Sequence, residues 1–172
     1  GDNRVAPPVR REAAPRSNLR AGHGELIGRV RDIEALCGAL GEHRLVTVAG
    51  PGGVGKSSVA HAVAAAVSAD FPDGVWWVEL APVSDGALTA DAIARAIGMP
   101  LRAGIEELVE QIRGARLLLV LDNCEHLIAA AADAIEAILQ GAPGVHVLAT
   151  SQERLRCSVE HTHRLQIGRA HV

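Results

Sequence analysis

Residues Ala49–Ala60, AGPGGVGKSSVA, carry two overlapping phosphate-binding patterns. The glycines at 50, 52 and 55 fit the dinucleotide fingerprint G-x-G-x-x-G. The first and last of these, followed by Lys56 and Ser57, fit the P-loop of nucleoside triphosphatases, G-x-x-x-x-G-K-[ST]. In both patterns the glycines let backbone N–H groups come close to phosphate oxygens. The chemistry open to this segment is therefore the binding of a phosphorylated nucleotide.

Acidic residues farther along the chain discriminate between the two patterns. A dinucleotide site needs an acid about 20 residues after the loop to hold the ribose, and Glu79 could serve. That interpretation leaves Lys56 and Ser57 without a role. A triphosphatase needs an acid directly after an apolar strand to hold magnesium through water, and Asp122 follows the run RLLLVL. Two independent matches favour a P-loop NTPase over a dinucleotide enzyme.

Lys56 is the only lysine among the 17 basic residues of the chain. Arginine stands wherever a bare positive charge suffices, so the exception at position 56 points to a specific need. A slim ammonium on a flexible stem fits between phosphate oxygens, whereas a planar guanidinium is broader. The composition thus supports a phosphate-binding role for Lys56.

These patterns assign roles to the residues of the loop. We expect Lys56 to neutralise the β- and γ-phosphates, Ser57 to ligate Mg²⁺, and Asp122 to complete the metal shell through water. Asp122 is also a candidate catalytic acid. The predicted nucleotide-binding residues of the loop are Gly50, Pro51, Gly52, Gly53, Val54, Gly55, Lys56, Ser57 and Ser58.

Strands alternate with helices along the chain. The patterns predict strands at 44–49, 75–80, 116–122 and 145–151, a fifth strand beginning at 161–167, and helices at 31–40, 56–69, 89–98, 105–114 and 125–141. Such alternation predicts an α/β fold with a parallel sheet between two layers of helices. The loop and Asp122 would then both lie at the carboxyl ends of strands, where such folds bind ligands.

Composition and length indicate one soluble domain within the 172 residues. The net charge of −3 gives no basic footprint for nucleic acid, and no apolar run approaches the roughly 20 residues of a membrane span. The three cysteines lack zinc-like spacing and are interpreted as reduced thiols of a cytoplasmic protein. We interpret residues 1–24 as a disordered Pro/Arg/Ala linker and 25–165 as the domain. Residues 166–172, which include the adapter-like IGRAHV, are interpreted as non-native.

Several stretches resemble the STAND nucleotide-binding domain, an NB-ARC-like, ASCE-type P-loop NTPase found in large bacterial transcriptional regulators of the winged-helix or LuxR type. The stretches are LIGR (26–29), HRLVTVAGPGGVGKSSVA (43–60), FPDGVWWVELAPVSD (71–85), RLLLVLDNCEHL (116–127) and VLATSQERL (147–155). The resemblance implies a switch that holds ADP when off and ATP when on, and that hydrolyses ATP slowly. It also implies that the chain stops before the lid domains that follow in this family.

The resemblance further implies functions for residues outside the loop. Ile27, Gly28 and Arg29 match the family's hGR motif, which lies against the adenosine. Thr150 and Ser151 match the sensor position near the γ-phosphate. The expected partners are the nucleotide, DNA only through another module, and a second copy on ATP binding, with no membrane contact.

Two positions depart from related enzymes and predict weak ATPase activity at most. Asn123 stands where many AAA-type enzymes carry a second acid, so Glu125 is the nearest downstream candidate to polarise water. Gln152 stands where many relatives have arginine, and Arg154 could substitute for it. A vigorous P-loop ATPase or kinase-like enzyme, and a scaffold that binds nucleotide without turnover, remain alternatives.

Overall fold

The computed structural model describes residues 17–19, 26, 28–99 and 103–167. The strands are β1 (Leu45–Ala49), β2 (Val75–Glu79), β3 (Leu118–Asp122), β4 (His146–Ser151) and β5 (Glu160–Arg164). The helices are α1 (Val30–Glu42), α2 (Lys56–Ala66), α3 (Thr89–Ile97), α4 (Ile105–Ile112) and α5 (Ile128–Gly141), with 3₁₀ turns at Ser68–Asp70 and Gly86–Leu88. No helix in this part of the chain is long and apolar enough to cross a membrane.

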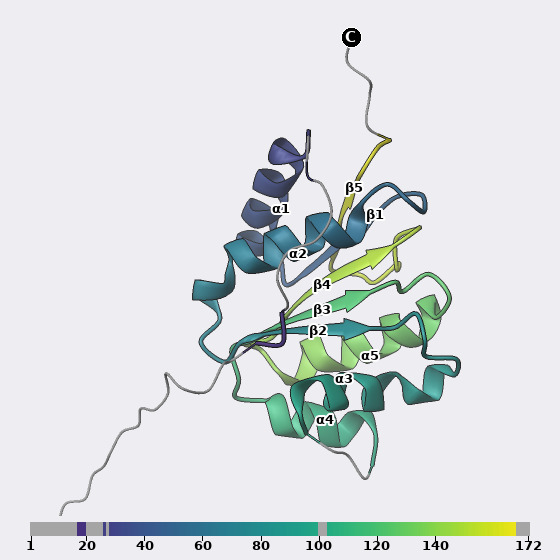
Figure 1. The fold of residues 1–172 in the computed structure, drawn as a ribbon. Helices are drawn as coiled ribbons and strands as arrows, with labels where there is room; N and C mark the ends of the chain where they lie inside the picture. The colour runs from purple at the N-terminus through teal and green to yellow at the C-terminus, as the bar shows by residue number, and fades with distance from the viewer. Residues whose placement is uncertain (1–16, 20–25, 27, 100–102, 168–172) are drawn as a thin grey trace, which may run out of the picture.

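The five strands form one parallel sheet in the order β2-β3-β4-β1-β5. Helices α1 and α2 cover one face of the sheet, and α3, α4 and α5 cover the other (Figure 1). β1 and β3 are buried along their whole length, as expected for strands covered on both faces. The structure confirms the predicted α/β fold with three layers and a parallel sheet, including the fifth strand.

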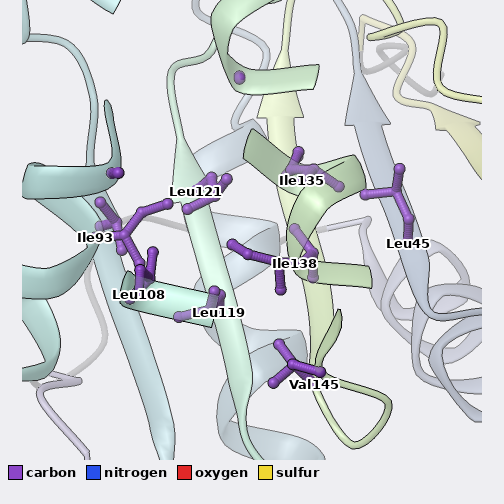
Figure 2. Close-up of a cluster of buried hydrophobic side chains, with 14 of the residues drawn as sticks. Leu45, Ile93, Leu108, Leu119, Leu121, Ile135, Ile138 and Val145 are labelled. Atoms are coloured by element: carbon purple, nitrogen blue, oxygen red, sulfur yellow. The ribbon is translucent and has the colours of Figure 1, made fainter. Parts of the chain in front are cut away.

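Two apolar clusters hold the helices on the sheet. Side chains alternate along β3, so Leu119 and Leu121 face α3, α4 and α5, whereas Leu118 and Val120 face α1 and α2. Figure 2 shows the first cluster, in which Leu121 lies toward Ile135 of α5 and Leu119 lies nearer Leu108 of α4. These buried contacts on both faces make β3 a rigid support for the residues at its carboxyl end.

The edge of the sheet at β2 contacts a short segment from the N-terminal region. The Asn18 side chain pairs with the backbone of Trp77: its Oδ1 accepts from the Trp77 N–H (2.6 Å) and its Nδ2 donates to the Trp77 carbonyl (2.9 Å). Ser17 forms an isolated parallel β-bridge with Val75, and Leu19 packs against the apolar cluster beneath α1 and α2. Contacts with the domain therefore begin within the segment 1–24 that the sequence assigns to a linker. The rest of that segment lies outside the described residues, and so do residues 168–172 of the predicted tail.

The sequence misplaces the start of the helix predicted at 125–141. This helix, α5, begins at Ile128, because a turn closed by the Leu127 N–H and the Cys124 carbonyl (2.9 Å) comes first. Asn123, at φ +65°, turns the chain out of β3 just before that turn. Glu125 therefore lies in a turn rather than in a helix.

Candidate functional site

The loop between β1 and α2 follows a path that depends on two of its glycines. A Cβ on Gly50 would lie 2.8 Å from the Leu165 carbonyl oxygen, so no side chain fits between the loop and the residue after β5. Gly55 precedes α2 with φ +98°, a conformation that residues with side chains rarely adopt. The Gly50 N–H donates to the Ser151 carbonyl (3.1 Å), which fixes the start of the loop against β4.

Helix α2 begins without a side-chain cap. Its first backbone bond runs from the Val59 N–H to the Gly55 carbonyl (3.0 Å). The N–H groups of Lys56, Ser57 and Ser58 precede that bond, so they have no acceptor within the helix. Free N–H groups and the positive end of the helix dipole make such a terminus an anion-binding site.

The Lys56 side chain is held within the loop. Only 7% of Lys56 is exposed, and its Nζ donates to the Pro51 carbonyl (3.0 Å). The ammonium of the chain's only lysine therefore lies across the loop, beside the start of α2.

Asp122, at the carboxyl end of β3, joins the loop through hydrogen bonds. The Ser57 hydroxyl donates to both of its carboxylate oxygens (2.8 and 3.0 Å), and the Thr150 hydroxyl donates to Oδ1 (2.6 Å). Burial raises the pKa of the Asp122 carboxyl, hydrogen bonds from Thr150 and Ser57 oppose that rise, and the nearby Glu79 charge adds to it. The structure thus brings together the two predicted metal ligands, and both offer the oxygen atoms that Mg²⁺ prefers.

The two predicted sensor residues make different contacts. β4 lies between β1 and β3, so Thr150 reaches Asp122 and also accepts a hydrogen bond from the Asn123 N–H (2.8 Å). The Ser151 side chain is buried, and its hydroxyl has no hydrogen-bond partner among the described residues. Its backbone carbonyl accepts the hydrogen bond from Gly50 described above.

A second acid lies at the same edge of the sheet, next to Asp122. Glu79 ends β2 and pairs in register with Asp122. The Asn123 side-chain amide donates to Glu79 Oε2 (2.8 Å) and to Asp122 Oδ2 (3.2 Å). The sequence alone suggests Glu79 only as a ribose ligand and does not predict this arrangement. Once the strand order shows that β2 adjoins β3, an acid at the end of β2 is the signal that predicts this arrangement.

The motifs, the strand order and these contacts agree with a comparison against known proteins. Residues 22–162 match the family Novel STAND NTPase 1. The chain belongs to this STAND family. An uncharacterized protein of Mycobacterium tuberculosis is 37% identical over 142 residues, which cover 81% of the chain and 36% of that protein. The chain thus spans little more than a third of that relative's length.

Other relatives of this STAND domain are named as regulators. A Mycobacterium tuberculosis protein named as an HTH-type transcriptional regulator is 40% identical over 73% of the chain and 14% of its own length.

A solved STAND protein with a tetratricopeptide repeat sensor, from Pyrococcus horikoshii, superposes with a TM-score of 0.54 at 16% identity, covering 86% of this chain and 24% of that one. At that identity the likeness concerns the fold alone.

Glu125 of the STAND domain, the other predicted catalytic acid, has a different environment from Glu79. One of its carboxylate oxygens, Oε1, is buried and has no hydrogen-bond partner in the part of the chain that the structure describes. No hydrogen bond between described residues joins Glu125 to Ser57, Asp122 or Thr150. Its catalytic role stays a prediction.

Arg29 of the hGR motif contacts the loop between β1 and α2. Its Nη2 donates to the carbonyls of Val54 and Gln166 (both 2.9 Å), and its Nη1 bonds to Asp32 (3.3 Å). Gly28 has φ +78°, and Ile27 lies outside the described residues. Arg29 therefore ties the start of α1 to the loop, and its predicted contact with adenosine stays a prediction.

The residues considered for γ-phosphate sensing lie after β4. The Gln152 amide nitrogen lies 3.6 Å from the point that a Cβ on Gly52 would occupy, so its side chain reaches the loop. Arg154 is exposed. The Gln152 side chain that reaches the loop therefore carries no charge.

Proposed function

We propose that this STAND domain binds ATP and ADP and acts as a nucleotide-operated switch of a transcriptional regulator, with slow hydrolysis of ATP. The observation that carries the proposal is the hydrogen-bonded pair of Ser57 and Asp122 beside the uncapped start of α2. Lys56 adds a positive charge across the same loop. Together these groups offer N–H donors, an ammonium and oxygen ligands to one polyphosphate chain.

The donor set fits a magnesium ion bound with the nucleotide. Ser57 and Asp122 supply a hydroxyl and a buried carboxylate, and Mg²⁺ binds through one or two such groups together with phosphate oxygens and water. Ser57 would hold the ion directly, and Asp122 would hold it through water. The ion would supply positive charge against the β- and γ-phosphates.

Slow hydrolysis follows from the chemistry of two side chains. The Asn123 amide, directly after Asp122, cannot take a proton from water at neutral pH. Gln152, beside the loop at Gly52, has no charge to offer a γ-phosphate in the transition state. Loss of a general base costs about 10²–10⁴ in rate, and loss of a cationic finger costs about 10³–10⁵.

The regulatory part of the proposal is supported by the relatives. One is named as an HTH-type transcriptional regulator, and the regulatory protein AfsR of Streptomyces griseus is 34% identical over 63% of the chain and 12% of its own length. In this proposal DNA is contacted through another module, the ATP-bound form self-associates, and the protein works in the cytoplasm, where its nucleotides are.

The proposed function is tested by titrating the chain with a fluorescent ADP analogue in the presence and absence of Mg²⁺. We expect saturable binding that unlabelled ADP and ATP displace and that GTP displaces more weakly. We expect ATP, but not ADP, to lose much of its affinity when Mg²⁺ is removed. Absence of saturable binding in either condition would refute the proposal.

A further inference from the structure

Two carboxylates, not one, lie at the carboxyl edge of β2 and β3. Glu79 and Asp122 occupy paired positions at the ends of these neighbouring strands. Between them lies the Asn123 amide, whose nitrogen donates to Glu79 (2.8 Å) and to Asp122 (3.2 Å). Since a side-chain amide has two hydrogens to donate, both are used on these carboxylates.

The two carboxylates differ in what they can still accept. Asp122 is 3% exposed, and its oxygens already accept hydrogen bonds from Ser57, Thr150 and Asn123. Glu79 is exposed and accepts the bond from Asn123 through Oε2. Glu79 is therefore the carboxylate at this edge that water can reach.

The backbone fixes the amide that holds Glu79. At φ +65°, Asn123 leaves β3 in a conformation that asparagine tolerates better than most residues. Its N–H donates to the Thr150 hydroxyl (2.8 Å), and the N–H of the next residue, Cys124, donates to the Thr150 carbonyl (2.9 Å). These bonds to β4 set the direction of the turn, so the Asn123 side chain can bridge Asp122 and Glu79.

We propose that Glu79 is the catalytic carboxylate of the slow ATPase reaction, and that Asn123 is a positioning residue for it. The proposal rests on the proposed function, because it concerns ATP bound at the loop. Glu79 replaces the second acid that is missing after Asp122, and it comes from the neighbouring strand instead of from the next residue. Asn123 has no carboxylate of its own, and its amide instead holds the carboxylate of Glu79 in place.

The step balances without any further reactant. The oxygen of a water molecule forms a bond to the γ-phosphorus while the bond from that phosphorus to the bridging oxygen breaks. The electron pair of the broken bond stays on the bridging oxygen of ADP. The proton lost by the water passes to the Glu79 carboxylate and from there to solvent, so that ATP and water give ADP, phosphate and a proton.

Glu79→Gln separates the chemical role from the structural one. The glutamine carbonyl still accepts the bond from Asn123, but it cannot take a proton at neutral pH. We expect phosphate release from bound ATP in a single turnover to slow by about 100-fold or more. ATP affinity should stay within about threefold, and the melting temperature should stay unchanged, as for other surface substitutions. Glu106→Gln, on the exposed side of α4, is the matched control and should leave all three values as in the wild type.

Three results would overturn the assignment. The first is phosphate release by Glu79→Gln at a rate within threefold of the wild type. The second is loss of hydrolysis in Glu125→Gln but not in Glu79→Gln. The third is a wild-type chain that binds ATP and releases no phosphate above the uncatalysed rate. Failure of the proposed function gives a different result, because the wild-type chain would then not bind ATP at all.

Discussion

The loop at Gly50–Ser58, here called the phosphate loop, and the acid edge beside it, formed by Glu79, Asp122 and Thr150, are built in different ways. The loop takes its groups from consecutive residues, Gly50–Ser58, and these include the backbone N–H groups at the start of α2. The acid edge takes its side chains from separate strands: Glu79 from β2, Asp122 from β3 and Thr150 from β4. Local sequence therefore determines the groups proposed to bind phosphate, whereas strand order determines which acids meet. The two regions touch at the hydrogen bond between Ser57 and Asp122.

This difference implies that binding and hydrolysis respond to different substitutions. Changes in the loop should remove nucleotide affinity and, with it, every later step. Changes at the end of β2 and β3 should leave affinity nearly intact and slow the reaction. The contact between the two regions, at Asp122, should affect both through the metal ion.

The largest effect is expected at the loop. Lys56→Met keeps the apolar stem of this buried side chain but removes the ammonium that bonds to Pro51. Since charge-assisted contacts to phosphate are among the strongest polar interactions, we expect ATP affinity to fall by about 100-fold or more. Isothermal titration calorimetry measures the affinity, and circular dichroism checks that the fold is retained. Unchanged affinity in a folded variant would show that the loop is not the phosphate site.

A smaller effect is expected where the two regions touch. Asp122→Asn keeps an oxygen that accepts from Ser57 and Thr150 but removes the negative charge that favours a divalent cation. We expect ATP affinity to fall by about tenfold in the presence of Mg²⁺ and to change little in its absence. Titrations with Mg²⁺ and with EDTA measure the two values. An equal loss in both conditions would contradict a metal-linked role.

The smallest effect on binding, with a moderate effect on rate, is expected at Asn123. Asn123→Gly allows the positive φ at this position while removing the amide that bridges Glu79 and Asp122. We expect phosphate release to slow by about tenfold, as for the loss of one hydrogen bond to a charged group, with ATP affinity unchanged.

The matched control for this variant is Asn18→Gly, which removes another side-chain amide bonded to β2, at Trp77. It should lower the melting temperature without altering the rate of phosphate release. An equal fall in rate in both variants would show that Asn123 acts only by supporting the edge of the sheet.

The sequence was sufficient for the features that depend on near neighbours. The loop, Asp122 after an apolar strand, and the alternation of strands and helices are all local patterns, and the structure has each of them. The role of Glu79 could not be predicted, because strand lengths and spacings do not say that β2 lies beside β3. The turn at Cys124–Leu127 was missed for a related reason, since the Thr150 contacts that fix it come from a distant strand.

Another feature outside local patterns is the contact of Asn18 with β2. The segment around it has the composition of a linker, and its composition gives no sign that a side-chain amide takes the place of a strand backbone at Trp77. The hydrogen bond of the Thr150 hydroxyl is another contact that local sequence patterns do not predict. This bond to Asp122 exists because β4 lies between the strands that carry the loop and the acid.

We propose that the loop holds ATP while the acid edge cleaves it slowly. The most direct test mixes γ-labelled ATP with excess protein and Mg²⁺, and then follows protein-bound label and released phosphate in the same samples. We expect most label to bind at once and phosphate to appear more slowly than about one per minute, in line with the uncharged Gln152 beside the loop. Phosphate release faster than about one per second, or label that never binds, would contradict this proposal.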